Sequence, residues 1–392
     1  MKRQGVALIG NLCDCAIIFG ELLRSEDLEI AVYVSRKELQ DSMATSLRGD
    51  VSEELEERIS RLREHNPEAH IWDHAPGLNW LRNAVPGGSA LVQMISFLRL
   101  LRHLRKADVI ISFAMYHVVA MLSGRPYLAF STGADLHEIA MERSLRGWLM
   151  RRAFRRAKSL HACYDPVSRE NATKLKLQIS APFMLPLHIP PQPVAFGARS
   201  GPIKVFMPSR QDWGGPGRDQ LAKGNDRFIR AWARRVNDGW ASTMTIVEYG
   251  DHVAAAKKLV GDLGVADHVR FVPRLNQPDL QRSIEDADLV ADQFDQGTPG
   301  ILALQTMATG RALSIHWDEF SSLFAYSTVP PVLNGNDEDV LYQALGGCAS
   351  RDELQALGKA GYDWVCREYD RRKLCERLRL SVSLVTGIPM SR

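Results

Sequence analysis

The sequence has few residues of the kinds that mark metal or disulfide proteins. Only six of its 392 residues are cysteines. They are scattered along the chain as Cys13, Cys15, Cys163, Cys348, Cys366 and Cys375. These spacings fit neither a zinc knuckle nor a thioredoxin-type pair, and the histidines show no metal-ligand spacing either. The sequence therefore predicts buried, reduced thiols and no metal site.

Long apolar runs and a strong charge of one sign are also missing. The first apolar stretch, after Met1-Lys2-Arg3, is interrupted by Asn11 and Asp14 and has no small-residue cleavage site, so it does not fit a signal peptide. No stretch is apolar for the ~18 residues that a membrane span needs. The net charge of only +3 predicts no nucleic-acid partner. We expect a cytoplasmic protein without a membrane-spanning helix.

What the sequence does contain is a repeated alternation of strands and helices. At 392 residues the chain is long enough for two domains of roughly 190 residues. Apolar strand segments alternate with amphipathic helices in residues 1–190 and again in residues 203–369, which predicts two doubly wound parallel sheets of the Rossmann-like α/β class. The proline-rich residues 191–202 are expected to be the hinge between them. A terminal helix over 370–392 has no strand after it and is expected to pack back across that hinge.

The most informative segment is ADLVADQFDQGTPGILALQTMATGRALSI, residues 287–315. It predicts a strand ending near Asp292, then a loop, then a helix capped by Thr298, with Pro299 at its first position and Gly310 just past its end. Gly297 and Gly300 leave the backbone open in front of this helix. N–H groups at Gly300 and Ile301 and the positive end of the helix dipole would favour an anion there.

A second segment, PSRQDWGGPGRDQLAKGNDRFIRAW at residues 208–232, supplies two cations. Arg210 lies at the carboxyl end of a predicted strand, where open α/β sheets bind ligands, and Lys223 closes a glycine-rich loop before the next helix. Either residue alone fits a surface position equally well. Together with the open helix start, they indicate a site for a diphosphate.

At this point the sequence resembles a known family. The order of strand-Ser-Arg, glycine-rich loop, Lys-Gly, VEYGD, LGVADHVRFVP, ADLVADQ and ALQTMATGRAL is similar to the nucleotide-sugar domain of retaining GT-B glycosyltransferases, group 1 and family 4-like, related to bacterial glucosyl- and mannosyltransferases. The likeness covers residues 203–315 well and the N-terminal half more loosely. It implies a GT-B architecture, two domains facing across a cleft, and sugar transfer without a metal or other cofactor.

The resemblance also implies roles for residues of the C-terminal half. It puts the donor phosphates on Arg210 and Lys223, and the base near Arg274. The family's two glutamates, spaced E-x7-E, fall on Gly297 and Gln305. With Thr298, these two positions would face the donor sugar and ribose. Gln305 could still hydrogen-bond ribose through its amide, although its helical pattern equally fits a core-edge glutamine.

Because Gly297 offers no side chain, the catalytic residue stays unassigned, with Asp295 and Asp135 as candidates. Asp135 lies in the segment Ser131-Thr132-Gly133-Ala134-Asp135, which resembles the family's acceptor-side motif without its histidine. A helix N-cap explains Asp135 equally well. Gly10 and Asn11, after the first strand, are further acceptor-side candidates, although asparagine is also a common turn residue.

Residues 143–158, RSLRGWLMRRAFRRAK, form a basic segment with interspersed apolar residues. A helix of this composition could rest on anionic lipid headgroups at the inner membrane face, which would suit a lipid-linked acceptor. A solvated face over a sheet is the alternative, because apolar and basic positions do not separate cleanly in the sequence.

The function predicted from these features is transfer of a sugar from a nucleoside diphosphate donor to a glycan, lipid-linked or small-molecule acceptor, as in polysaccharide biosynthesis. Two alternatives remain open: a catalytically silent nucleotide-sugar-binding scaffold, and a sugar-nucleotide epimerase of the same fold. A nicotinamide dehydrogenase is disfavoured because the first turn, beginning at Gly10, lacks the G-x-G-x-x-G pattern.

Overall fold

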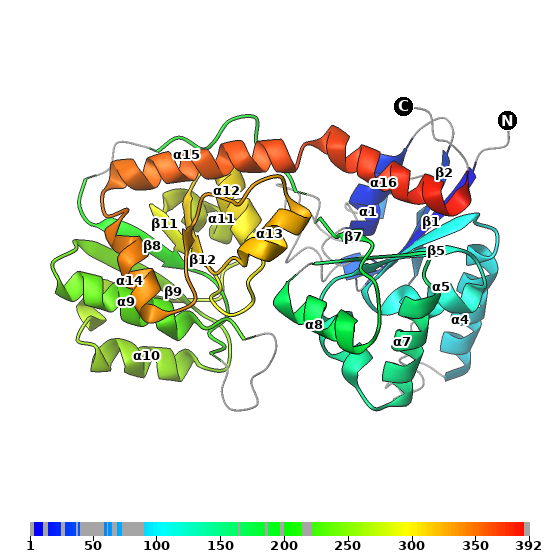
Figure 1. Cartoon of the computed structure of the whole chain (residues 1–392), viewed down its shortest axis with the longest axis horizontal. Helices are drawn as coiled ribbons and strands as arrows, with labels where there is room; N and C mark the ends of the chain where they lie inside the picture. Colours follow the sequence, from blue (N-terminus) through cyan, green and yellow to red (C-terminus); the bar gives the residue numbers. More distant parts are fainter. Residues whose placement is uncertain are drawn as a thin grey trace. The chain divides into compact units, whose positions relative to one another are not determined.

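The structure is a computed structural model that describes residues 4–10, 15–24, 28–36, 38–39, 59–60, 62–64, 69–72, 90–163, 165–184, 187–196, 200–213 and 222–387. The chain forms two compact units (Figure 1). Unit 1 comprises Met1–Cys163, Ser168–Pro186 and Arg371–Arg392, and unit 2 comprises Tyr164–Val167 and Leu187–Asp370. The terminal segment thus belongs to the first unit, and the proline-rich segment belongs to the second.

Unit 1 is built on a seven-stranded parallel sheet with the order β3-β2-β1-β4-β5-β6-β7. Its strands are β1 (Gln4–Ile9), β2 (Leu28–Ser35), β3 (Ala69–Trp72), β4 (Val109–Phe113), β5 (Tyr127–Ser131), β6 (Ser159–Ala162) and β7 (Ala181–Pro182). Every residue of β4 and β5 is buried. Central strands of a parallel sheet are covered on both faces, which is why they appear in the sequence as short, continuous apolar runs.

Helices cover both faces of this sheet and enclose two apolar cores. They are α1 (Cys15–Leu23), α4 (Ala90–Leu104), α5 (His117–Ser123), α6 (Ala134–His137), α7 (Leu145–Arg156), α8 (Pro166–Lys174) and α16 (Arg371–Thr386), with short 3-10 turns at Ala114–Tyr116 and Ile139–Met141. One core centres on the ring cluster of Phe19, Phe113 and Phe130, whose centroids lie 5.3–5.4 Å apart. The other contains Met150 and Phe154 of α7.

The last helix, α16, completes the first of these cores. Its Leu378 and Val382 belong to the same apolar cluster as Phe19 of α1. The thiol of Cys375 donates a hydrogen bond to the Leu22 carbonyl, at 2.9 Å. Figure 1 shows α16 beside α1, so residues from the two ends of the chain pack together.

Unit 2 is built on a six-stranded parallel sheet with the order β10-β9-β8-β11-β12-β13. Its strands are β8 (Ile203–Met207), β9 (Ser242–Glu248), β10 (Val269–Pro273), β11 (Leu289–Ala291), β12 (Ala312–Ile315) and β13 (Leu333–Asn334). Its helices are α9 (Asn225–Asn237), α10 (Val253–Asp262), α11 (Gln277–Asp286), α12 (Ile301–Thr309), α13 (Glu319–Ala325), α14 (Glu338–Gly346) and α15 (Arg351–Glu368), with a 3-10 turn at Ala266–His268. The predicted fold class, two doubly wound parallel sheets, is confirmed.

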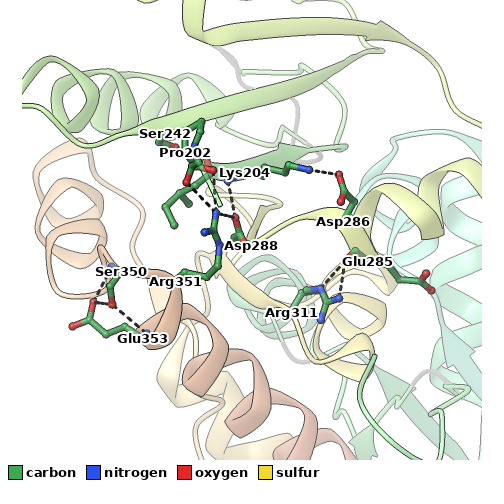
Figure 2. A network of polar contacts seen from close by, with 12 residues as sticks. Pro202, Lys204, Ser242, Glu285, Asp286, Asp288, Arg311, Ser350, Arg351 and Glu353 are labelled. Carbon is green, nitrogen blue, oxygen red and sulfur yellow. Dashed lines mark hydrogen bonds and ion pairs between the residues drawn. The ribbon is translucent and has the colours of Figure 1, made fainter. Parts of the chain in front are cut away.

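A polar network lies at the amino-terminal edge of the unit 2 sheet (Figure 2). The carboxylate of Asp288, whose side chain has no exposed surface, accepts two hydrogen bonds from the Arg351 guanidinium, both at 3.1 Å. The same carboxylate accepts the Lys204 backbone N–H at 2.9 Å. Arg351 lies at the start of α15, so this pair fastens that helix to β8 and β11.

Helix α15 also approaches the end of α12 very closely. A Cβ built on Gly358 would lie only 2.3 Å from the Gly310 carbonyl oxygen, so position 358 has no room for a side chain. Gly310 itself has φ +81° and ends α12 in a left-handed cap, as the sequence predicts. Beside it, Arg311 is 1% exposed and donates to the carbonyls of Glu285 and Val194.

Candidate functional site

The order of the strands in unit 2 reverses between β8 and β11, and open α/β sheets bind ligands at the carboxyl ends of strands at such a switch point. Ser209 follows β8 and Asp292 follows β11. The Ser209 hydroxyl donates a hydrogen bond to the Asp292 carbonyl and accepts one from the Asn225 amide at 3.0 Å. These bonds tie together two strand ends and the start of α9.

Lys223 is held at this switch point from several sides. Its backbone N–H donates to the Asp212 carbonyl, and its own carbonyl accepts the Phe294 N–H, each at 2.6 Å. Its ammonium donates to the Gln293 side-chain oxygen. Arg210 lies close by, with its Nε 3.1 Å from a carboxylate oxygen of Asp212. The structure therefore brings the two predicted phosphate-binding cations together.

The charges of this cluster influence one another. Burial lowers the pKa of the Lys223 ammonium, the nearby Asp292 carboxylate opposes this shift, and Arg210 adds to it. Asp292 is 3% exposed, and its burial raises the pKa of its carboxyl to about 6, while Lys223 acts in the opposite direction. The site therefore contains, beside the Lys223 ammonium, a buried carboxyl group whose pKa of about 6 lies close to neutral pH.

The N-terminus of α12 faces this cluster, but the helix begins later than predicted. Its first residue is Ile301 and its N-cap is Gly300, so the predicted cap at Thr298 and start at Pro299 are wrong. The Gln293 amide donates to the Thr298 carbonyl and so holds that residue in the preceding loop. A Cβ built on Gly300 would lie 3.8 Å from a carboxylate oxygen of Asp292. The start of α12 therefore lies beside Asp292, the carboxylate that interacts with Lys223.

The loop before α12 contains the predicted sugar-side residues. Gly297 has φ +70°, and a Cβ built on it would lie 3.1 Å from Asp318 Cβ and 3.4 Å from His316 Nε2. Asp295 forms an ion pair with Arg227 at 2.6 Å. Asp295, the catalytic candidate predicted in unit 2, is therefore paired with an arginine of α9.

Gln305 is half-buried on α12, and its carbonyl accepts the Thr309 hydroxyl at 2.7 Å. The predicted base residue, Arg274, is exposed just after β10, and its guanidinium lies 4.6 Å from the centre of the Tyr249 ring. An aromatic ring and a planar cation at neighbouring strand ends provide stacking surfaces for a flat ligand. Gly250, with φ +105°, allows the backbone to approach Gln211, because a Cβ there would lie 2.7 Å from the Gln211 nitrogen.

In unit 1 the predicted acceptor-side residues lie at the carboxyl ends of β1 and β5. Gly10 has φ +88°, and a Cβ on it would lie 2.7 Å from Tyr116 Cδ2, so the glycine lets the ring approach the backbone. Asn11 lies outside the described residues, as does the glycine-rich loop at 214–221.

Asp135 is 1% exposed and is the centre of a buried hydrogen-bond network. It is the second residue of α6 and not its N-cap, a position that Gly133 occupies. One carboxylate oxygen is 2.9 Å from His117 Nε2, and His117 Nδ1 is 2.8 Å from the Ser112 hydroxyl. The other oxygen accepts hydrogen bonds from the Ser131 hydroxyl and from the backbone N–H groups of Thr132, Gly133 and Leu136. Burial alone would raise the pKa of this carboxyl, but these bonds, His117 foremost, hold the pKa below its usual value.

The basic segment 143–158 contains α7, and the structure separates its two faces. The buried face consists of Gly147, Met150, Ala153 and Phe154. The exposed face, called here the α7 stripe, consists of Leu145, Trp148, Arg152, Arg155 and Arg156. Trp148 is 49% exposed, and the guanidinium of Arg152 lies 5.4 Å from its ring centre.

Two residues in or beside the switch point were not predicted as site residues: Gln293, which follows β11, and His316, which follows β12. Each is a polar residue in the loop that follows a strand of the unit 2 sheet, and that position was the only signal available in the sequence. Among the residues that the structure describes, no group of three or more His, Cys, Asp or Glu side chains is arranged to hold a metal ion. In the same residues, no helix is long and apolar enough to cross a membrane.

No family model and no curated protein sequence matches the chain. Solved structures do match: the HepE protein of Anabaena in complex with UDP-glucose is 12% identical, with a TM-score of 0.58, over 97% of this chain and 100% of that one. Sucrose-phosphate synthase from Thermosynechococcus elongatus is 13% identical, with a TM-score of 0.60, over 98% and 100%. An O-GlcNAc transferase mutant from Thermobaculum terrenum is 13% identical, with a TM-score of 0.61, over 98% and 68%. The chain therefore has the GT-B fold of these glycosyltransferases.

Proposed function

We propose that this protein is a glycosyltransferase that uses a nucleoside diphosphate sugar as donor and a glycan, a lipid-linked sugar or a small molecule as acceptor. We further propose that it acts with retention of configuration and without a metal ion. The observation that carries the proposal is the convergence of Arg210, Lys223 and the start of α12 at the switch point of the unit 2 sheet.

In this proposal the donor diphosphate lies between Lys223, Arg210 and the N–H groups of Gly300 and Ile301. Two cations and a helix N-terminus can balance the charge that grows on a diphosphate as the sugar leaves. Lys223 suits this role because three interactions with Asp212, Phe294 and Gln293 fix its position before a ligand arrives. Because the Lys223 side chain is already held in place, binding a ligand costs little of its conformational entropy, and this favours affinity.

The other parts of the donor would lie on either side of the phosphates. Thr298, Gly297 and Gln305 are assigned to the sugar and ribose, and Arg274 with Tyr249 to the base. Gly10, Asn11 and Asp135 are assigned to the acceptor side in unit 1. Asp135 would act there as a positioning residue, because its bonds hold the backbone of Thr132 and Gly133.

The reaction would break the bond between the sugar's C1 and the β-phosphate oxygen and join C1 to an acceptor hydroxyl oxygen. The hydroxyl proton must pass to a base, and Asp295 is the candidate carboxylate in the sugar-side loop, although Arg227 already pairs with it. A side chain is missing at Gly297, which favours a second candidate function, a scaffold that binds a nucleotide sugar without turnover.

A thermal-shift titration tests donor binding. The ligands are UDP, GDP, ADP, TDP and CDP and their hexose conjugates, starting with UDP-glucose because the similar HepE protein was solved with it. Ligand at ~100 times its dissociation constant adds about 2.7 kcal/mol of stability. We expect a shift for one nucleotide that Arg210→Ala and Lys223→Ala abolish and that the exposed control Lys258→Ala preserves. No shift with any nucleotide would refute the proposal.

Turnover then separates the candidate functions. A glycosyltransferase consumes the donor only with an acceptor or, slowly, with water. An epimerase converts the donor sugar with no acceptor present, and a scaffold leaves the donor intact. Mass spectrometry of the donor after incubation with and without lipid and glycan acceptors distinguishes the three outcomes.

We also propose that the α7 stripe rests on an anionic lipid surface. The residues from Arg143 to Lys158 contain seven cations and no acidic residue. In the structure Leu145, Trp148 and three arginines share one exposed face, and an aromatic ring beside guanidinium groups suits the boundary between headgroups and acyl chains. Each arginine near such a surface contributes about 1 kcal/mol.

Vesicle sedimentation tests this surface. We expect the protein to sediment with vesicles of phosphatidylcholine and 30% phosphatidylglycerol and to stay in the supernatant with phosphatidylcholine alone. Reversing two charges, Arg152→Glu with Arg156→Glu, should reduce binding more than tenfold, whereas Lys174→Glu on α8 should not. Equal binding to both kinds of vesicle, or none to either, would contradict the proposal.

A further inference from the structure

His316 lies at the end of β12, one strand beyond the switch point. Its backbone N–H donates to the Gln293 carbonyl at 2.9 Å. The next residue, Trp317, exchanges two hydrogen bonds with the Asn334 side chain, at 2.8 and 2.9 Å. The backbone at residues 316–317 is therefore fixed to the ends of both neighbouring strands, β11 and β13.

The imidazole of His316 points toward the loop before α12. A Cβ built on Gly297 would lie 3.4 Å from its Nε2, so the ring edge is close to this glycine's backbone. The Asp318 N–H donates to the Gly297 carbonyl at 2.9 Å and closes the loop against the β12 end. A side chain at position 297 would crowd both the imidazole and the Asp318 side chain, so glycine allows the loop to pack this closely against the ring.

His316 is connected to the proposed phosphate site through a single residue. Gln293 accepts the His316 backbone N–H on its carbonyl and the Lys223 ammonium on its side-chain oxygen. The backbone at the end of β12 and the Lys223 ammonium are therefore hydrogen-bonded to the same glutamine.

The order of the strands then gives the direction in which a donor would lie. Along the carboxyl edge of the sheet come Arg274 after β10, Tyr249 after β9, Arg210 after β8, Gln293 after β11 and His316 after β12. If the base lies at the β10 side and the diphosphate at β8 and β11, the group attached to the outer phosphate extends toward β12. That group is the sugar.

The protonation state of His316 suits a sugar hydroxyl. Burial lowers the pKa of the imidazole, and Arg227 also lowers it, while Asp318, Asp295 and a hydrogen bond with Asn334 act in the opposite direction. The lowered pKa favours the neutral ring, whose nitrogens can donate or accept a hydrogen bond. A sugar hydroxyl can pair with a donor or an acceptor nitrogen, whereas a phosphate oxygen only accepts, so a hexose hydroxyl matches this ring better than a phosphate does.

We infer that His316 is a sugar-recognition residue, which hydrogen-bonds a hydroxyl of the hexose in a nucleoside diphosphate sugar. This inference rests on the proposed function of the unit 2 site. It predicts that His316 contributes to the binding of the sugar and contributes nothing to the binding of the nucleotide.

Calorimetric titration of matched ligands separates these contributions. The probes are UDP with UDP-glucose and UDP-N-acetylglucosamine, and GDP with GDP-mannose, on the full chain. In His316→Phe, which keeps a ring but removes both hydrogen-bonding atoms, we expect affinity for the preferred nucleotide sugar to fall about tenfold, as for the loss of about 1.4 kcal/mol. Affinity for the bare nucleoside diphosphate should stay within twofold. His316→Gln, which keeps a donor and an acceptor, should recover part of the loss.

The exposed His268, in the turn before β10, provides the matched control, and His268→Phe should change neither affinity. Equal losses for the nucleotide and its sugar conjugate would show that His316 acts on the phosphate site through Gln293, and would overturn the inference. Unchanged affinities in both His316 variants would overturn it as well. Failure of the wild-type protein to bind any nucleotide would instead reject the proposed function itself, together with this inference.

Discussion

Removing the guanidinium of Arg351 should destabilise unit 2 severely. The substitution Arg351→Met keeps much of the side-chain length but removes the two guanidinium hydrogen bonds to the Asp288 carboxylate, which has no exposed surface (Figure 2). Breaking a buried pair in this way costs about 3–5 kcal/mol. We take about 3 kcal/mol, because the Arg351 side chain is 18% exposed. For a unit of this size each kcal/mol lowers Tm by about 2–4 °C, which gives a fall of about 6–12 °C.

Differential scanning calorimetry measures this fall in the melting transition of unit 2. The control is Arg282→Met, which removes an exposed pair with Asp279 and should cost below about 1 kcal/mol. The double variant Arg351→Met with Asp288→Asn removes the uncompensated charge and should recover part of the loss. If Arg351→Met lowered Tm no more than Arg282→Met does, the buried carboxylate would not depend on its partner, and the reasoning would be refuted.

Two further predictions concern unit 2. Folding raises the pKa of Asp292 from its ordinary 3.8 to about 6, so the ionised carboxylate destabilises the fold at higher pH by up to about 3 kcal/mol. Asp292→Asn should therefore raise Tm at pH 8 and have little effect near pH 4, and a gain that is equal at both pH values would contradict this assignment. Gly358→Ala should lower the unfolding free energy by more than about 2 kcal/mol in urea titrations, because its Cβ would meet the Gly310 carbonyl at 2.3 Å. Gly261→Ala, in α10 with no atom within 4 Å of the new Cβ, should instead stabilise by up to about 1 kcal/mol, and similar effects of the two alanines would refute the packing argument.

The sequence predicts the strands better than it predicts the loops between them. The strand predicted to end near Asp292 is β11, which ends at Ala291, because a buried parallel strand is a short apolar run ended by polar or small residues. The start of α12 was predicted two residues early. Thr298 and Pro299 fit the preferences of a helix start, but the Gln293 side chain binds the Thr298 carbonyl and keeps that residue in the loop. A hydrogen bond between a side chain and a backbone carbonyl leaves no periodic pattern in the sequence, so it could not be predicted from the sequence.

The candidate site was predictable only in part for a similar reason. Arg210 and Lys223 follow strand and loop signals, and the structure places them together. His316 gives no such signal, because a lone histidine after a strand gains meaning only when the order of the strands places it beside Gln293. Asp135 fitted a helix cap by its position, whereas in the structure it bonds to His117 and Ser131, which lie on other elements.

The position of α16 has a consequence for the synthesis of the chain on the ribosome. Leu378 and Val382 complete the apolar core around Phe19, but they are translated after all of unit 2. At about 5–20 residues per second, the roughly 190 residues of unit 2 take about 10–40 seconds to make. During that time the first unit to emerge has an open apolar surface on α1, and the second unit can fold before it. The core of the first unit is therefore completed only after the second unit has been synthesised, and until then the apolar face of α1 is the surface that a nascent-chain chaperone would find exposed.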